Sequence, residues 1–515
     1  MEIGDRPEIC FEGKVPLPPN VRPVIILEGS DYDMGYQYYQ QLVQVFGRWM
    51  LKEVAPKELT DEGLTALRAY QWYLRKYAPE MIDLFKGMAD GGTDAGVPLS
   101  YEDVLAHCTG IEYILEAPPR NEIKSYPGAP PGSERVKLPP ECSGWAAWGR
   151  ATKDGELICG ASTDHEHRCE VTIVVFPESG NNFIISPFRP TMLGQLCGHP
   201  GMNNKGLAYV QHGATHWIQC KPREKYTYGI TEGTAILHTL RFADCAGEAK
   251  DMQLDYPSGD GYAGGFWADI DGSAFIIECR ENPIAIRHAG DFGETDFLYQ
   301  TNNALHKDLG HCQAEPGGRN VYIPHGGWLG SNASTIQSIA RNLGVWNMLH
   351  NYQGEVDLNF AKMIYRFSGE PPAYPTLEEA DDAWFARKGE GWDQKICHQN
   401  NALVSIVLPD DGDEGLYYVC AGCAAEIANP LGPQGHHYLV SPTHSFYQLK
   451  LASSPDKLVE AAKRQAQYDL YYADHQLMKL NYSDAAYAPL NEIFNRAATE
   501  WIKGSYYQSV AAKTE

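Results

Sequence analysis

The chain has 515 residues, of which 43 % are hydrophobic and 21 % charged, and this apolar content excludes a disordered protein. It suffices for one large core or for about two to four domain-sized units. Asp and Glu outnumber Lys and Arg by 66 to 42, and a net charge of −24 argues against nucleic-acid binding, because phosphate backbones would be repelled.

The chain start and the cysteines indicate the compartment. The first ten residues, MEIGDRPEIC, lack the basic and apolar regions of a secretory signal, and no stretch approaches the ~18 consecutive apolar residues of a membrane helix. The 13 cysteines are odd in number and scattered singly, which suits a reducing compartment better than a disulfide scaffold. We therefore expect a cytoplasmic protein with no membrane partner and no nucleic-acid partner.

Residues 1–116 are predicted to form a strand followed by helices. Residues 24–27 are all apolar, and the run ends at Glu28-Gly29, as a strand would. Helix starts are then marked by capping residues or by a proline, at Ser30, Thr60, Pro79 and Ser100. Acidic residues three positions after Ser30 and Ser100 strengthen two of these caps.

A proline-rich linker is predicted next, over residues 117–141. The stretch from 116 to 141 contains seven prolines and shows no apolar periodicity. It ends abruptly between Glu141 and Cys142, where strand-like sequence begins. This junction divides the chain into an N-terminal segment and a core.

From Cys142 to residue 450 the sequence predicts an α+β core with a sheet that is mainly antiparallel. Asp271-Gly272 between two apolar runs indicates a β-hairpin. A helix is expected from Ser334 to about Leu349. A C-terminal helical segment is expected over residues 451–515, with a long helix from Pro455 to about Leu477.

A cysteine at the end of an exposed linker has a specific chemical use. If the Glu141–Cys142 bond is cut, Cys142 carries a nucleophilic thiol and a free α-amine on one residue. An α-amine has a pKa near ~7.7–8, so part of it is neutral at pH 7 and acts as the base for the thiol. The thiol can also cut the bond itself, by attacking the preceding carbonyl in an N-to-S acyl shift.

The segment that starts at this cysteine resembles a known family. CSGWAAWGRATKDGELICGASTDHE is similar to the start of the mature chain in N-terminal-nucleophile (Ntn) hydrolases, closest to the acyl-coenzyme A:6-aminopenicillanic acid acyltransferase group of peptidase C45-like amidohydrolases. Five other segments resemble that group in the same order: LEGSDYDMGYQYYQQL, GMNNKGLAY, GFWADIDGSAFIIE, TNN and ALVSIVLPDDGDEGLYYVCAGCA. The resemblance implies an αββα-sandwich fold, autoproteolysis of a zymogen before Cys142, and a helical pro-segment.

The resemblance also assigns roles to residues. Cys142 would be the cysteine nucleophile and its amine the general base, while Asp164 would orient that amine. Asn302 would donate its amide to the oxyanion of the tetrahedral intermediate. A second oxyanion donor would fall near His212-Gly213. Asn203 is a further oxyanion or substrate-pocket candidate, although a turn role suits it better.

Two positions depart from the family pattern. Gly-Arg-Asn-x-Asp is replaced by Gly160-Ala161-Ser162-Thr163-Asp164, so the family arginine and asparagine are missing. The charge that tunes the thiol must then come from elsewhere, and the sequence offers Arg150, Arg168 and Arg287 without ranking them. The family histidine of the pro-region is replaced by Tyr38, which should alter packing more than chemistry.

Metal and redox chemistry have weaker support. His165-Glu166-His167 with Cys169 lacks the spacing of a zinc site, since neighbours on a strand point to opposite faces. Cys420 and Cys423 form a single CxxC without a thioredoxin context. We expect no metal and no cofactor.

The sequence thus predicts a hydrolase that cleaves the linear amide bond of a small N-acyl substrate through a thioester. An acyltransferase that passes the acyl group to an amine is the first alternative, because both reactions share every step up to the thioester. The second is an uncleaved, non-catalytic member that binds a ligand or serves in an assembly. A Cys–His peptidase ranks last, since no partner histidine motif is recognisable. Homo-oligomers are common among large Ntn enzymes, but the sequence does not reveal the oligomeric state.

Overall fold

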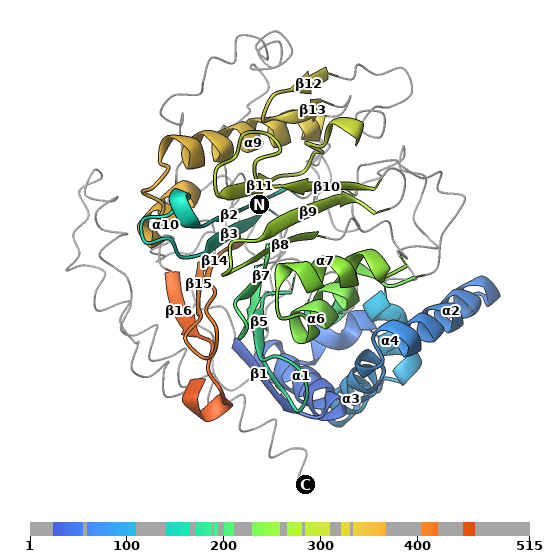
Figure 1. Ribbon diagram of the computed structural model, residues 1–515. Helices are drawn as coiled ribbons and strands as arrows, with labels where there is room; N and C mark the ends of the chain where they lie inside the picture. The colour runs from blue at the N-terminus through green and yellow to red at the C-terminus, as the bar shows by residue number, and fades with distance from the viewer. Residues whose placement is uncertain are drawn as a thin grey trace, which may run out of the picture.

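The computed structural model describes residues 24–54, 59–109, 141–164, 171–187, 190–193, 200–210, 229–257, 265–280, 284–309, 321–329, 333–366, 403–420 and 446–458. These residues form two large sheets and a two-stranded hairpin, with helices on both outer sides (Figure 1). The expected linker up to residue 140 and most of the C-terminal segment, including all but the start of the helix expected from Pro455, lie outside the described residues. The last linker residue, Glu141, is instead the first residue of a strand.

The larger sheet has eight strands in the order β1-β4-β5-β6-β7-β8-β9-β10. Its strands are β1 (Val24–Gly29), β4 (Thr172–Pro177), β5 (Phe183–Ile185), β6 (Gly201–Asn203), β7 (Leu207–Val210), β8 (Gly265–Asp269), β9 (Ala274–Cys279) and β10 (Ala285–His288). All neighbours are antiparallel except β1 and β4, which run parallel with Val24 opposite Thr172. The predicted hairpin at Asp271-Gly272 is confirmed, because it joins β8 to β9.

The smaller sheet has six strands in the order β11-β2-β3-β14-β15-β16, all antiparallel. Its strands are β2 (Glu141–Ala147), β3 (Ile158–Asp164), β11 (Phe297–Gln300), β14 (Leu403–Leu408), β15 (Leu416–Cys420) and β16 (Phe446–Lys450). β12 (Val321–Ile323) and β13 (Gly327–Leu329) form the separate hairpin.

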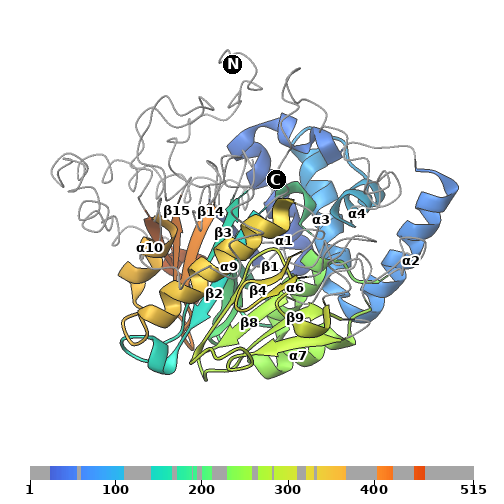
Figure 2. The ribbon, with the colours of Figure 1, turned by 90° about the horizontal axis from the view of Figure 1, so that it is seen from above.

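Three apolar clusters define the layers. The middle cluster joins the two sheets face to face, with Val174 and Ile276 from the larger sheet and Ala161 and Val419 from the smaller. A second cluster lies between the larger sheet and helices α1 (Asp31–Phe46), α2 (Asp61–Tyr77), α3 (Glu80–Asp94), α4 (Tyr101–Thr109), α6 (Glu232–Phe242) and α7 (Ala246–Asp255). A third lies between the smaller sheet and helices α9 (Ala333–Asn351) and α10 (Leu358–Arg366) (Figure 2). The described chain is therefore an α+β sandwich.

The three predicted helix caps are confirmed, and so is the helix start at Pro79. Ser30 and Thr60 accept hydrogen bonds from the backbone N–H groups of Asp33 and Gly63. Ser100 and Asp103 exchange the two bonds of a capping box. Pro79 precedes α3 as expected but makes no side-chain cap, since proline has no polar group to offer.

The N-terminal segment is part of the sheet and not a separate lobe. β1 pairs with β4 along its whole length, and its residues Ile25 and Leu27 are buried in the outer cluster. Helices α1 and α3 complete that cluster by packing on the same face. The residues before Glu141 therefore supply a strand and a helical layer that the larger sheet needs for its burial.

Candidate functional site

Cys142 lies at the start of β2, the strand between β11 and β3 in the smaller sheet. Its backbone is paired with Thr163 of β3, and its residue is 2 % exposed. Side chains alternate along a strand, so Cys142 shares its face with Ala146, which belongs to the core between the two sheets. Ser143 and Trp145 point the other way, toward α9 and α10. The thiol therefore lies on the side of β2 that faces the space between the sheets.

Asn302 is placed beside Cys142 by strand register. β11 runs antiparallel to β2 with Gln300 opposite Gly144, so continuing the register by two residues brings Asn302 opposite Cys142. The backbone N–H of Cys142 donates to Asn302 Oδ1 at 2.7 Å. This nitrogen would become the α-amine if the preceding peptide bond were cut. The structure thus brings together two of the predicted site residues that are 160 positions apart.

Arg341 is the third member of the site, and the sequence analysis missed it. Its guanidinium donates to the carbonyl oxygen of Cys142, to Ser143 Oγ at 3.0 Å and to Asn302 Oδ1 at 2.6 Å. The side chain comes from α9 and is 2 % exposed as a residue. A buried, permanently charged group thus lies beside the sulfur-bearing residue and fixes the orientation of the Asn302 amide.

The Asn302 amide nitrogen is one of several buried polar atoms of the described residues, such as Trp145 Nε1 and Ser405 Oγ, that have no hydrogen-bond partner. Nδ2 is buried and has no hydrogen-bond acceptor, while Oδ1 accepts from both Cys142 and Arg341. An unsatisfied buried donor costs about 1–3 kcal/mol, and what sets Asn302 apart from the other such residues is its hydrogen bond to the backbone nitrogen of Cys142. This is the geometry expected of a donor that is held ready for a developing negative charge.

The turn that carries Asn302 is fastened by α9. Ser338 Oγ accepts the N–H of Asn302 at 2.6 Å, and the Thr301 hydroxyl donates to the Ser338 carbonyl at 2.7 Å. Asn342 Nδ2 donates to Asn303 Oδ1 at 2.8 Å. Arg341 and Asn342 follow Ser338 by three and four positions, so they lie on the same side of the helix as Ser338.

Asp164 and Glu141 are placed by their backbones alone. They lie opposite each other at the ends of β3 and β2, so Asp164 is across the strand pair from the proposed cleavage position. Their side chains lie outside the described residues, as do His212 and Gly213. The orienting role of Asp164 and the second oxyanion donor therefore stay predictions.

Asn203 stabilises a turn through its side-chain amide, as the sequence analysis favoured over a role in an oxyanion or substrate site. Its Nδ2 donates to the carbonyl oxygens of Leu240 and Ala243, both at 2.8 Å. Its Oδ1 accepts from the backbone of Lys205 at 3.0 Å and of Leu207 at 3.1 Å. Each amide hydrogen and each lone pair is used inside the fold, which corrects its inclusion among the oxyanion and pocket candidates.

Two of the three arginines offered by the sequence are paired with carboxylates of their own. Arg150 is exposed and pairs with Asp296 at 2.9 Å. Arg287 is fully buried between Glu278 and Glu294. Arg168 lies outside the described residues. Arg341 is an arginine that does bond to Cys142, and no spacing from Cys142 in the sequence indicates it, because only the packing of α9 on β2 brings the two together.

Cys159, on the neighbouring strand β3, does not compete with Cys142 for the role of nucleophile. Burial raises the pKa of the Cys159 thiol well above its usual range, so this cysteine of β3 stays protonated. Within the ranges given above, no three His, Cys, Asp or Glu side chains are gathered as a metal would require. Residues 165–169 and Cys423 fall outside those ranges. Among the helices that the structure describes, none combines the length and apolar character needed to cross a bilayer.

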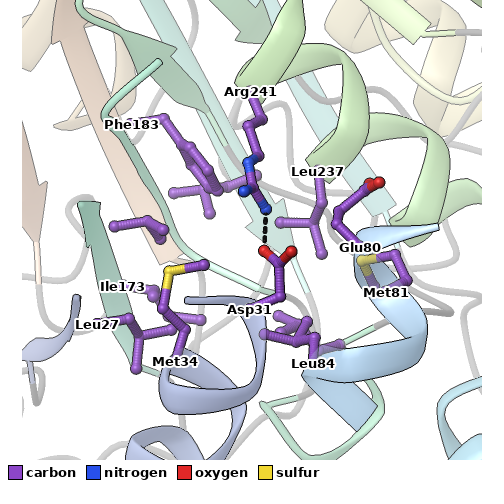
Figure 3. A pocket seen from close by; sticks show the side chains of 13 residues that line it. Leu27, Asp31, Met34, Glu80, Met81, Leu84, Ile173, Phe183, Leu237 and Arg241 are labelled. Carbon is purple, nitrogen blue, oxygen red and sulfur yellow. Dashed lines mark hydrogen bonds and ion pairs between the residues drawn. The ribbon is translucent and has the colours of Figure 1, made fainter. Parts of the chain in front are cut away.

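A separate pocket lies in the outer helical layer (Figure 3). It encloses about 480 Å³, including the part open to solvent. Its wall is mainly apolar: Leu27, Asp31, Met34, Glu80, Met81, Leu84, Ile173, Val175, Phe183, Ile185, Leu193, Leu237 and Arg241. Arg241 is paired with Asp31 at this pocket. The wall contains none of Cys142, Asn302 and Arg341, so the pocket is distinct from the candidate catalytic site.

Comparison with known proteins adds one relative. No family model matches the chain. It is similar to an uncharacterized protein of Archaeoglobus fulgidus, with 30 % identity over 203 residues, which is 37 % of this chain and 32 % of that protein. The chain therefore spans about a third of the length of that relative.

Proposed function

We propose that the chain is an N-terminal-cysteine hydrolase with the Ntn αββα fold, related to the peptidase C45-like amidohydrolases. Cleavage of the Glu141–Cys142 bond would activate it, and it would hydrolyse the linear amide bond of a small N-acyl substrate. The fold is in keeping with this, because two face-to-face sheets lie between helical layers. Cys142 lies at the start of a strand of one of those sheets.

One observation carries the proposal. The nitrogen of Cys142 donates to Asn302 Oδ1 at 2.7 Å, while the other end of that same amide is a buried donor without an acceptor. The nucleophile, the future base and a candidate oxyanion donor are thereby joined in one contact. Arg341 bonds to both residues, so their mutual orientation is held from a third side.

The chemistry follows from these groups. The α-amine of Cys142 takes the thiol proton, and the thiolate attacks the amide carbon, so that a C–S bond forms and the carbonyl oxygen becomes negative. Asn302 Nδ2 donates to that oxygen. The C–N bond then breaks, and the leaving amine takes the proton from the ammonium. Water, activated by the same amine, hydrolyses the thioester and restores the thiol.

Cleavage would leave the two fragments assembled. β1 belongs to the larger sheet. An ion pair between Arg241 and Asp31 and a hydrogen-bond contact of 2.6 Å between His238 Nδ1 and Glu80 Oε1 also cross between the fragments. The pocket of Figure 3 has walls from both fragments. We therefore expect a two-chain protein in which residues 1–141 are retained.

Mass spectrometry of the purified protein tests the proposal. We expect fragments 1–141 and 142–515 that co-purify, and we expect Cys142→Ala to remain one chain. Cys142 is 2 % exposed in the intact chain, so a thiol reagent should label it faster after cleavage than before. A wild-type chain that stays intact and unlabelled at Cys142 would exclude the enzyme and support the non-catalytic ligand-binding alternative, which the burial of this thiol favours.

A screen of N-acyl amides then separates hydrolysis from transfer. Release of free acid in water alone supports the amidohydrolase. Product that forms only when an acceptor amine is added supports the acyltransferase alternative, because both share the thioester of Cys142.

A further inference from the structure

A fully buried ion cluster lies where the two sheets meet the turn that carries Asn302. Arg287 of β10 is bonded to Glu278 of β9 at 3.2 Å and to Glu294, which precedes β11, at 3.0 Å. All three side chains are 0 % exposed. Removing charges from water is costly, and an apolar cluster of similar volume often stabilises a core equally well. The cluster therefore calls for an explanation other than stability.

The contacts of this cluster converge on the chain around Asn302. Before that residue, Arg287 Nη1 donates to the carbonyl oxygen of Tyr299 at 3.1 Å and to Gln300 Oε1 at 2.6 Å. After it, Glu278 Oε2 accepts the backbone N–H groups of Leu305 at 3.0 Å and His306 at 2.9 Å. The chain is thus held on both sides of the oxyanion donor.

Gln300 connects Arg287 of the ion cluster to the turn. Its Oε1 accepts from Arg287, and its Nε2 donates to the carbonyl oxygen of Asn303 at 2.9 Å. One side chain therefore links the ion cluster to the residue that follows Asn302. Glu294 differs from Glu278 in this respect, because its second oxygen accepts at 2.8 Å from the backbone of Phe292, which precedes β11 in the chain, and not from the turn that follows β11.

We infer that Glu278 is a positioning residue for the oxyanion donor. Through Leu305, His306 and Arg287 it holds the 300–306 turn so that Asn302 Nδ2 meets the oxygen of the tetrahedral intermediate. This inference rests on the proposed function and adds a residue that touches neither the nucleophile nor the substrate. Its physical basis is that a donor displaced by about 1 Å loses a large part of its effect on the rate.

Glu278→Gln and Glu294→Gln form a matched pair. Each variant removes one carboxylate from the same buried guanidinium, so their effects on stability should be similar. Only Glu278→Gln also weakens the hydrogen bonds to the backbone of Leu305 and His306 in the 300–306 turn. The reporter is the burst of p-nitrophenol that matured protein releases from p-nitrophenyl acetate, since this acylation forms an oxyanion. Alkylation of Cys142 by iodoacetamide forms none, so it reports on the thiol alone.

We expect Glu278→Gln to lower the burst rate about 10–100-fold relative to Glu294→Gln, with alkylation rates that agree within about twofold. Gln300→Met, which buries no new charge, should also lower the burst rate while leaving the alkylation rate unchanged, but by a smaller factor. This variant replaces Glu278→Gln in the test if Glu278→Gln does not fold. Equal burst rates in Glu278→Gln and Glu294→Gln would overturn the inference, as would a parallel loss of burst and alkylation. A wild-type protein that is cleaved but gives no burst would instead contradict the proposed function, and the inference with it.

Discussion

The α1–α3 crossing and the 300–306 turn are both buried, yet they are held in opposite ways. In the crossing, backbones touch directly: a Cβ added at Gly35 would lie 1.9 Å from the carbonyl oxygen of Leu84, and one at Gly87 would lie 1.9 Å from that of Tyr32. In the turn, hydrogen bonds from α9 and an ion cluster hold the chain. The first region is fixed by shape and the second by polar partners.

This difference separates two kinds of sensitivity. A close-packed crossing has no room for one added carbon, because interiors are packed as densely as organic crystals. A polar turn accepts changes of volume more readily but not the loss of a partner, since a buried group left unpaired costs about 1–3 kcal/mol. We therefore expect mutations in the crossing to change stability and mutations in the turn to change the chemistry at Cys142.

The largest effect is expected from Asn302→Asp. This change keeps the Oδ1 acceptor of Cys142 and Arg341 but replaces the Nδ2 donor with an acceptor, so it should lower the acylation rate by about 10²–10³-fold. The burst with p-nitrophenyl acetate measures that rate, and a thermal melt checks that the protein folds. A variant that retains the wild-type burst rate would remove Asn302 from the oxyanion site.

Gly87→Ala should have the next largest effect, on stability. The new Cβ would meet backbone atoms that cannot rotate away, so we expect a loss of about 3 kcal/mol in the free energy of unfolding, measured with urea. Gly247→Ala in α7 is the matched control. A Cβ added at Gly247 would have one neighbour within 4 Å, Cys245 Sγ at 3.7 Å, which is an ordinary van der Waals contact. That control should be neutral or stabilising by up to ~1 kcal/mol. Equal stabilities of the two variants would contradict the tight crossing.

The smallest effect is expected from Tyr36→Phe at the edge of the crossing. The Tyr36 hydroxyl donates to Asp94 at 2.9 Å, and burial together with this bond raises its pKa to about 12. The neutral phenol therefore contributes fully below pH ~10, the pKa of tyrosine in the unfolded chain, and this contribution is lost as the pH rises toward 12. We expect Tyr36→Phe to cost about 1 kcal/mol at pH 8.

The same variant should show a flatter pH dependence than the wild type above pH 10. Urea unfolding at pH 8, 10 and 11 measures this difference. Parallel curves for the two proteins would show that the Tyr36–Asp94 bond does not carry the alkaline loss.

Local features of the fold were predictable from sequence because they depend on neighbours in the chain. Ser30, Thr60 and Ser100 cap helices through groups three residues away, and Asp271-Gly272 closes a turn between adjacent strands. The pairing of β1 with β4 was not predictable in this way. It joins residues about 150 positions apart, and nothing in a single strand specifies its neighbour.

Some residues of the candidate site were likewise predictable from the sequence and one was not. Cys142 and Asn302 were predicted from a linker junction and a short motif, and the structure brings them within hydrogen-bond distance. Arg341 was missed, and Arg150 and Arg287 were considered in its place, because an arginine looks alike in sequence whether it is exposed, paired with carboxylates or directed at a nucleophile.

The amino-acid sequence by itself thus determined which residues begin helices, where hairpins turn, and which cysteine is set apart by its position. The tertiary structure alone decided which strand lies beside β1, which arginine reaches Cys142, and that Asn302 keeps one donor unpaired. The reason is physical: caps and turns are satisfied within a few residues, whereas sheet order and buried charge depend on segments that meet only when the apolar layers pack together.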